Sequence, residues 1–352
     1  MTSAVEAINH AAGTWWAFVA HATWQSSLLA VIFLAVVRLG RRWPAQLRYA
    51  LVVIALMKFA VPPTLSLPTG LFSRLGPVIV VDADKSAPGG LDHADEGPAA
   101  VTHALGAASW QSWLMLLHIA GAAAVAVYLA AQWAKVLAMA RRAKAFARGP
   151  LRDRLAALCR RMGLRLPVRL LISPEPVSPM AFGVLRPSIL VPASLFNDVS
   201  PRQMDTILAH ELAHHGRGDI LVNWCQAALT MLWWFNPVVW ILNRAIRTAR
   251  EDCCDDLLLA RKLTTDGTYC RALLKVATGL RRSLLAAAVS GFAQRVHPLG
   301  DRIRRIMDPD LRRVPKLSFL TLVLMLAIAG VVLPGLRSGM GLRQQPPGSA
   351  LI

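Results

Sequence analysis

Four apolar stretches limit what this chain can fold into. Each is about 20 residues long, the length at which an α-helix crosses the roughly 30 Å hydrocarbon core of a bilayer. They cover residues 15–37, 49–67, 110–134 and 317–336. Charged residues make up only 17% of the chain, whereas soluble domains contain about 25%. The sequence therefore predicts a mainly α-helical membrane protein with four transmembrane helices.

The net charge of +19 is unevenly distributed and predicts an orientation. Four arginines and no acidic residue lie between the first two stretches, and residues 135–316 have a net charge of +16. Residues 68–109 have a net charge of −3 and are rich in Pro, Gly and Ala. Because Lys and Arg collect in cytoplasmic loops, we expect residues 135–316 to lie in the cytoplasm. The N-terminus, the 68–109 loop and a short tail over 337–352 are expected outside.

Residues 135–316 alternate between helix and strand signals, which predicts an α+β domain inserted between the third and fourth spans. Helices are expected over 151–162, 200–215, 236–262 and from 266, and short strands over 168–172 and 188–191. In the helix over 200–215, Ser200 and Gln203 form a capping box around Pro201, and Gly216 offers a stop. The apolar, Trp-rich residues 220–235 are short for a span, and could lie on the membrane, re-enter it or pack beneath the other helices.

The main chemical signal is an HExxH motif inside the capped helix, formed by His210, Glu211 and His214. Residues at i and i+4 share a helix face, so both imidazoles can reach one Zn²⁺ while Glu211 acts as the catalytic base. With nine His in 352 residues, chance would produce roughly 0.003 such matches. Coincidence is therefore a poor explanation.

A catalytic zinc needs a third protein ligand and an open position. Glu251 lies on the next long helix, and Asp255 follows it by one helical turn. We expect Glu251 to complete the metal site and Asp255 to accept the outer N–H of a ligand histidine, which fixes its tautomer. The alternative is that Glu251 only pairs with a neighbouring arginine. Asp219 is a further candidate, either as a group behind a ligand or as a helix-end residue. All five cysteines lie after residue 150, in the part expected in the cytoplasm, so they are expected to be reduced.

The runs HELAHHGRGD, WFNPVVW and AREDCCDD resemble the BlaR/MecR family of membrane-embedded zinc metallopeptidases. AFGVLRPSILVP and DRIRRIM support the resemblance, which covers most of residues 135–316. It implies a gluzincin-like domain with zinc on His210, His214 and Glu251 and with Glu211 as the base. It also implies activation by an external signal, as in antibiotic responses, and loss of a cytoplasmic transcriptional repressor. No Ser-x-x-Lys or Lys-Thr-Gly motif occurs, so a penicillin-binding sensor domain is not expected.

A second similarity, to the HtpX and CAAX-protease group, rests on Met180-Ala181-Phe182 and on His297-Pro298 before Arg302. It implies that His297 or Arg302 supports the oxyanion, and that residues 181–191 offer an edge strand to a peptide. The leading hypothesis is a signal-transducing zinc endopeptidase whose substrate is a protein, such as a winged-helix repressor. The alternatives are a quality-control protease of membrane proteins and a non-catalytic receptor or scaffold. The other expected partners are membrane lipid and a second copy of the chain. Direct nucleic-acid binding is not expected, because the basic residues are dispersed and no nucleic-acid motif is present.

Overall fold

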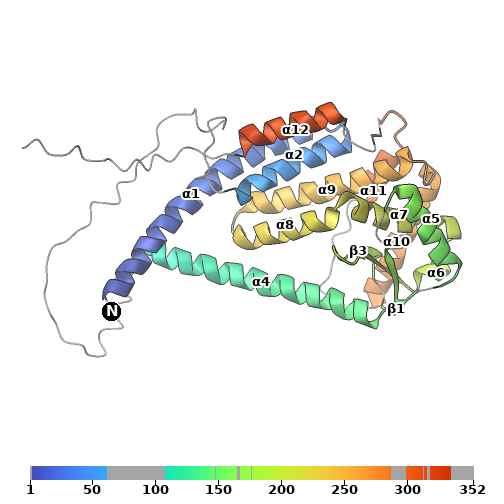
Figure 1. The fold of residues 1–352 in the computed structure, drawn as a ribbon, viewed down its shortest axis with the longest axis horizontal. Helices are drawn as coiled ribbons and strands as arrows, with labels where there is room; N and C mark the ends of the chain where they lie inside the picture. The colour runs from blue at the N-terminus through green and yellow to red at the C-terminus, as the bar shows by residue number, and fades with distance from the viewer. Residues whose placement is uncertain are drawn as a thin grey trace, which may run out of the picture. The chain divides into compact units, whose positions relative to one another are not determined.

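The computed structural model describes residues 2–61, 108–146, 148–164, 167–175, 177–286, 299–311, 313–314 and 318–333 (Figure 1). The chain divides into two compact units. The first contains residues 1–26, 57–117 and 323–352, and the second contains residues 27–56 and 118–322. The HExxH motif and the whole of the described sheet lie in the second unit. The predicted loop over 68–109 lies almost entirely outside the described residues, and the predicted tail over 337–352 lies wholly outside them.

Four apolar helical segments correspond to the four predicted spans. They are α1 (Thr2–Leu39), α2 (Ala45–Met57) with the short 3₁₀ turn Lys58–Ala60, α4 (Trp110–Arg142) and α12 (Phe319–Val332). Within the described residues, two stretches are helical, long and apolar enough to cross a membrane, Ala4–Leu39 and Trp110–Arg142. The helices α2 and α12 are shorter, and residues 62–67 and 334–336 of their predicted spans lie outside the described part.

Three polar side chains of the first unit, those of Lys58, Asn9 and Ser112, make hydrogen bonds inside the protein. Lys58 is buried, and its Nζ donates a hydrogen bond to the carbonyl oxygen of Leu333 at 2.7 Å. The side-chain oxygen of Asn9 accepts bonds from the N–H of Ser109 and the hydroxyl of Ser112, both at 2.8 Å. Such pairing is what an apolar surrounding requires, because an unpaired buried polar group there is costly.

The second unit is built on a small sheet that places the motif helix. Its strands are β1 (Lys144–Ala145), β2 (Arg169–Ser173), β3 (Met180–Phe182) and β4 (Ser188–Pro192), in the order β1-β2-β4-β3. The central strands β2 and β4 are parallel, and the two outer strands are antiparallel to their neighbours. The predicted strands 168–172 and 188–191 are therefore confirmed, while β1 and β3 were too short to be predicted.

Seven further helices of the second unit lie within the described residues after the first strand. They are α5 (Pro150–Met162), α6 (Leu195–Asp198), α7 (Pro201–Arg217), α8 (Asp219–Leu232), α9 (Pro237–Ala260), α10 (Asp266–Ala286) and α11 (Leu299–Ile306). The core lies between the sheet and these helices, where Leu155 of α5, Ile189 of β4, and Leu208 and Leu212 of α7 are completely buried. The predicted helices are confirmed, and residues 220–232 belong to a helix that was not predicted. The strong polarity of α11 and its short length explain why it too was missed.

The predicted capping box is present, but the predicted stop at Gly216 is wrong. Ser200 Oγ accepts a hydrogen bond from the N–H of Gln203, whose side chain accepts one from the N–H of Ser200. The helix α7 continues to Arg217, and Gly218 ends it in the left-handed conformation with φ = 73°. Gly216 has a packing role instead, since a Cβ there would approach Leu164 Cδ2 to 3.2 Å.

Candidate metal centre

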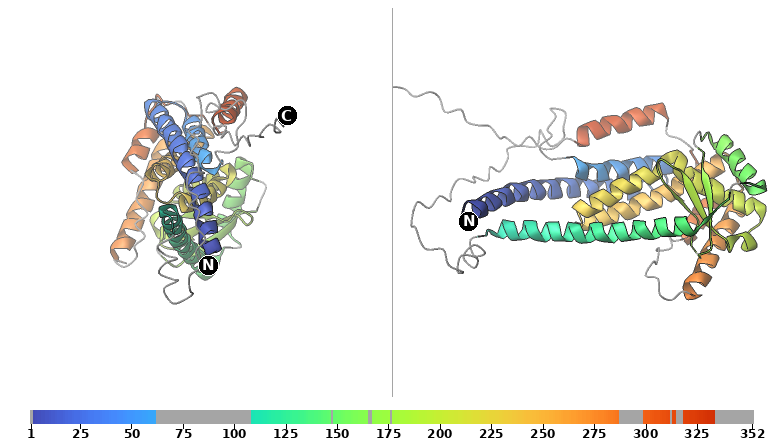
Figure 2. Two further views of the ribbon diagram at one scale, coloured as in Figure 1. Left: turned by 90° about the vertical axis from the view of Figure 1, so that its left-hand side faces the viewer. Right: turned by 60° about the horizontal axis from the view of Figure 1, so that its bottom comes forward.

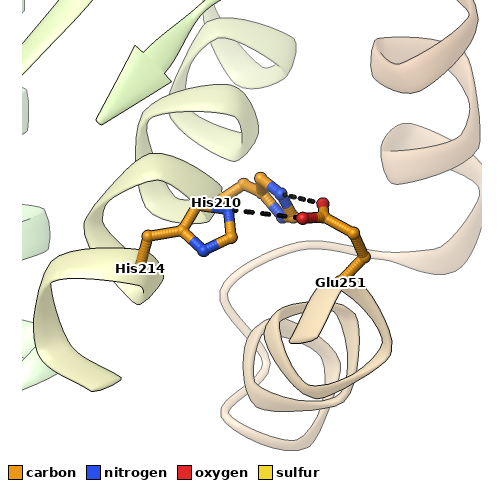
Figure 3. A group of neighbouring side chains, drawn as sticks. All are labelled: His210, His214 and Glu251. Atoms are coloured by element: carbon orange, nitrogen blue, oxygen red, sulfur yellow. Dashed lines mark hydrogen bonds and ion pairs between the residues drawn. The ribbon is translucent and has the colours of Figure 1, made fainter. Parts of the chain in front are cut away.

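The helix α7 presents His210 and His214 on one face, as their spacing predicts (Figure 3). Their ring centroids are 4.9 Å apart. The face is close to the core, because Ala209, Leu212 and Ala213 on the same turns are completely buried. The backbone of a well-packed and capped helix therefore fixes the spacing of the two imidazoles.

Glu251 reaches the same point from α9, which packs against α7 (Figure 3). Its Oε2 lies 3.2 Å from Nε2 of His210, and its Oε1 lies 3.9 Å from Nε2 of His214. One donor atom from each residue can be chosen so that all three lie within 4.8 Å of one another. The structure thus brings together the three predicted ligands, although the first and the last are 41 residues apart in the sequence.

The Nδ1 atom of His210 is held by a residue that the sequence analysis did not single out. The hydroxyl of Tyr269, on α10, lies 2.7 Å from this nitrogen and donates to Oδ1 of Asp255 at 2.5 Å. Asp255 itself is 3.7 Å from His210 Nδ1, too far for a direct hydrogen bond. The prediction that Asp255 accepts the histidine N–H is therefore corrected, because the Tyr269 hydroxyl lies between the two groups.

One further charged residue, Arg302, completes this side of the centre. Arg302, on α11, donates to both oxygens of Asp255 at 3.1 and 2.7 Å, and its Nη1 is 3.4 Å from Oε2 of Glu251. Its guanidinium is engaged with these carboxylates, and its support of an oxyanion stays a prediction. His297, the other residue expected in that role, lies outside the described residues.

The Nδ1 atom of His214 is held by Asp219, the first residue of α8. Asp219 Oδ2 lies 2.9 Å from this nitrogen, and Cys254 Sγ lies 3.4 Å from it. Asp219 also accepts hydrogen bonds from the Tyr49 hydroxyl and from Nε of Arg217, both at 3.3 Å. The sequence left two roles open for Asp219, support of a ligand histidine and a position at a helix end. In the structure, Asp219 has both roles.

The hydrogen bonds at Nδ1 determine which nitrogen of each imidazole is left to face Glu251. Because the Tyr269 hydroxyl donates to Asp255, its oxygen is free to accept the N–H of His210 Nδ1. Asp219 likewise accepts the N–H of His214 Nδ1. With a cation bound, both Nε2 atoms would direct lone pairs toward it, whereas without one the His210 Nε2 and Glu251 Oε2 share a hydrogen bond at 3.2 Å. The donor set of two imidazoles and one carboxylate fits a catalytic zinc, which takes three protein ligands and leaves one position open.

Glu211 points to the sheet side of α7. The backbone N–H of Ala181, in β3, donates a hydrogen bond to its carboxylate. Burial raises the pKa of the Glu211 carboxyl above its usual range, although nearby His214 and this hydrogen bond work in the opposite direction. The edge strand expected over 181–191 is partly corrected, because β4 is central in the sheet and the edge position belongs to β3.

The carboxylate of Glu251 has the opposite electrostatic surroundings. Burial by itself raises its pKa, but the hydrogen bond with His210 and the charges of His214 and Arg302 outweigh that effect. They hold the pKa of Glu251 well below its usual range, so this carboxyl is ionised at neutral pH. An ionised carboxylate is the form in which such a group binds a cation.

Comparison with known proteins identifies a family for the region that contains the candidate centre. Residues 17–306 match the family described as BlaR1 peptidase M56. The chain belongs to the BlaR1 peptidase M56 family. It is 32% identical over 177 residues to regulatory protein BlaR1 of Bacillus licheniformis, which covers 47% of this chain and 29% of the relative. It is 28% identical over 78 residues to the methicillin resistance mecR1 protein of Staphylococcus aureus, which covers 22% of this chain and 13% of the relative.

The matched region of this M56 peptidase family member includes every residue of the candidate centre, from Tyr49 to Arg302. The alignments span less than a third of the length of these curated relatives. The resemblance to BlaR and MecR proteins that the motifs suggested is therefore confirmed. Tyr269 was missed because no short motif connects it to HExxH, although it is one of only three tyrosines in the chain.

Proposed function

We propose that this M56 family member is a zinc-dependent endopeptidase of the bacterial inner membrane. The observation that carries the proposal is the convergence of His210 Nε2, His214 Nε2 and the Glu251 carboxylate within 4.8 Å. A structural zinc site usually closes all four positions with Cys or His. This centre offers three ligands with an acid beside them, which favours an enzyme over a non-catalytic scaffold.

Each residue of the centre has a separate role in the proposed peptide hydrolysis. His210, His214 and Glu251 would hold the zinc ion, which when bound supplies a Lewis acid that lowers the pKa of water and polarises the scissile carbonyl. Glu211 takes the proton of the attacking water and delivers it to the leaving amine. Tyr269 and Asp219 hold the two imidazoles in the tautomers that keep Nε2 free for the metal.

The proposed topology follows the distribution of charge and apolar length. Residues 1–67 contain two transmembrane helices, 68–109 an external loop, 110–134 the third helix and 317–336 the fourth, followed by an external tail over 337–352. The peptidase domain, 135–316, then faces the cytoplasm, and the N-terminus lies outside. Two helices of sufficient length and the arginines that follow residue 37 support this arrangement.

The proposed role is signal transduction, in which an external signal leads to cleavage of a cytoplasmic transcriptional repressor. The support is the similarity to proteins named as a regulatory protein and as a methicillin resistance protein. A quality-control protease of membrane proteins would use the same centre on a broad set of substrates. The two functions therefore differ in the number of substrates and not in the chemistry.

The test is a comparison of cellular proteins between cells with the wild-type chain and cells with Glu211→Gln. The signalling role predicts that the fragments of one repressor disappear in the variant, whereas quality control predicts that many fragments disappear. Purified Glu211→Gln should retain zinc and lose proteolysis, because the ligands are untouched. Retained proteolysis together with retained zinc would contradict the catalytic role of Glu211.

A further inference from the structure

Residues 220–243 form the longest uncharged part of the second unit outside α1, α2 and α4. They contain no Asp, Glu, Lys or Arg and include Trp224, Trp233, Trp234 and Trp240. In the structure they make α8, the connecting turn and the first two turns of α9. The two helices lie side by side and form a hairpin, called here the α8–α9 hairpin (Figure 2).

Large apolar side chains are exposed on the hairpin, while three of its polar side chains are buried. Its exposed large side chains have exposed fractions of 39% to 58% and are Leu221, Trp224, Leu232, Phe235, Trp240 and Ile241. Gln226, Thr230 and Asn243 are buried between the helices. Gln226 Nε2 donates to Asn243 Oδ1 at 2.9 Å, and Asn243 Nδ2 donates to Thr230 Oγ1 at 2.7 Å. A hairpin surrounded by water would show the opposite distribution.

The turn of the hairpin also keeps its polar groups inside the protein. Asn236 Oδ1 accepts the N–H of Val238, and its Nδ2 donates to Ser27 Oγ, both at 2.9 Å. The indole N–H groups of Trp234 and Trp240 donate to the carbonyl oxygens of His118 and Trp234, at 3.2 and 2.9 Å. Protein partners for such groups are what a bilayer core demands, because it has no water to supply them.

The hairpin runs along the apolar part of α4. Near its base, the rings of Trp224 and Trp133 meet edge to face with centroids 5.1 Å apart. At its tip, Trp234 packs over Gly121, where any Cβ would overlap the indole ring. Positions 121 and 133 of an α-helix are about 18 Å apart. Residues 110–134 carry no Lys, Arg, Asp or Glu. The hairpin therefore contacts α4 within the segment that is expected to cross the membrane.

We propose that the α8–α9 hairpin is inserted in the hydrocarbon core beside α4, with lipid acyl chains against its exposed apolar side chains. With 14 residues, α8 is about 21 Å long, so it enters the roughly 30 Å core without crossing it and the chain returns on the same side. Asp219 begins α8 and also supports His214. The candidate metal centre therefore lies at the membrane surface. The hairpin proposal stands on its own contacts and does not require peptidase activity.

Thiol labelling in vesicles of phosphatidylethanolamine and phosphatidylglycerol tests the insertion. Leu232→Cys and Ile241→Cys place thiols on the two helices, and Arg202→Cys places one on an exposed part of α7. N-ethylmaleimide crosses membranes but reacts with the thiolate form of cysteine. A thiol inside hydrocarbon stays protonated, because the apolar surroundings disfavour the charged thiolate. We expect both hairpin thiols of the full chain to react at least about tenfold more slowly than the Arg202→Cys thiol. Peptide masses identify each labelled position, so the native cysteines stay in place.

A photo-crosslinker identifies what covers the hairpin. Benzoylphenylalanine at position 232 should give products with phospholipid in the same vesicles. Equal maleimide labelling of Leu232→Cys, Ile241→Cys and Arg202→Cys would overturn the proposal. Crosslinks of position 232 to a second copy of the chain, without lipid products, would also overturn it. If one hairpin substitution disturbs folding, the other lies on the neighbouring helix and still gives the comparison.

Discussion

His210 and His214 lie on one face of α7, yet their supports come from different parts of the chain. Behind His210, Tyr269, Asp255 and Arg302 come from α10, α9 and α11 and lie in or beside the main core. Behind His214, Asp219 comes from α8 and is contacted by Tyr49 of α2. The support of His210 is thus internal to the peptidase part, whereas that of His214 includes the helix that follows the arginines near residue 40.

This difference indicates how the N-terminal helices could influence the centre. The start of α2 makes three polar contacts with the motif region: Tyr49 with Asp219, Gln46 with Arg217 and Arg48 with Asp252. The Arg48–Asp252 ion pair at 2.9 Å lies next to Glu251 in sequence. A displacement of α2 would therefore alter the surroundings of His214 and Glu251 before those of His210. The following predictions test whether the two sides differ in this way.

The largest effect is expected for Glu251→Gln, which affects both sides at once. The carboxylate faces Nε2 of His210 and of His214, and its replacement by an amide removes the negative charge of the donor set. We expect zinc affinity to fall by more than the roughly 10- to 100-fold typical of groups behind the ligands. Competition with a chromophoric chelator measures this, and an unchanged affinity would exclude Glu251 as a ligand.

The next effect compares the two supports directly, with Tyr269→Phe on one side and Asp219→Asn on the other. Each substitution keeps the shape of the side chain and removes one hydrogen-bonding function next to a ligand Nδ1. We expect zinc affinity to fall roughly 10- to 100-fold in each case. Asp255→Asn is the matched control for Tyr269. If it weakens binding while Tyr269→Phe does not, Asp255 must contact His210 directly in the zinc form.

A smaller effect is expected for Tyr49→Phe, which acts on His214 only through Asp219. The hydroxyl is 3.3 Å from Asp219, and the ring that lies under Arg217 is kept. The loss of one such bond changes stability by about 0.5–1.5 kcal/mol, which limits the change in zinc affinity to roughly tenfold. The double variant Tyr49→Phe with Asp219→Asn should be no weaker than Asp219→Asn alone. Additive losses would show that Tyr49 acts by another route.

The smallest effect is expected for Arg304→Gln, which sets the baseline for these measurements. Arg304 pairs with Asp301 at 3.1 Å on the surface of α11, and both side chains are more than two-thirds exposed. Exposed ion pairs contribute about 0–1 kcal/mol. Zinc affinity and the midpoint of thermal unfolding should stay within error of wild type. A clear loss of zinc would mean that α11 as a whole, and not Arg302 alone, is tightly coupled to the centre.

The candidate ligand set, whose three residues the structure brings together, could be predicted from the sequence because its information is local. A capping box, an i and i+4 pair and a Glu at the expected distance on the next helix determine which residues can meet. The residues behind the ligands could not be predicted in the same way. Tyr269 and Arg302 come from α10 and α11, and their approach to His210 and Asp255 depends on the packing of several helices.

The fold shows a similar division. Apolar runs and caps located α5, α7, α9 and α10, and two β-branched runs located β2 and β4. The outer strands β1 and β3 have two and three residues, too few for a periodic signal, and they exist because β2 and β4 offer them hydrogen-bonding partners. The α8–α9 hairpin remained ambiguous because its uncharged composition fits both a core and a lipid environment. Its outward-facing apolar side chains became visible only in the folded chain.

The central claim is that His210, His214 and Glu251 hold one zinc ion. The most direct test is the zinc content per chain of purified, folded full-length protein, measured by mass spectrometry of the elements for wild type, Glu211→Gln and Glu251→Gln. One zinc per chain is expected in wild type and in Glu211→Gln, and far less than one in Glu251→Gln. A full zinc complement in Glu251→Gln, or no zinc in folded wild type, would contradict it.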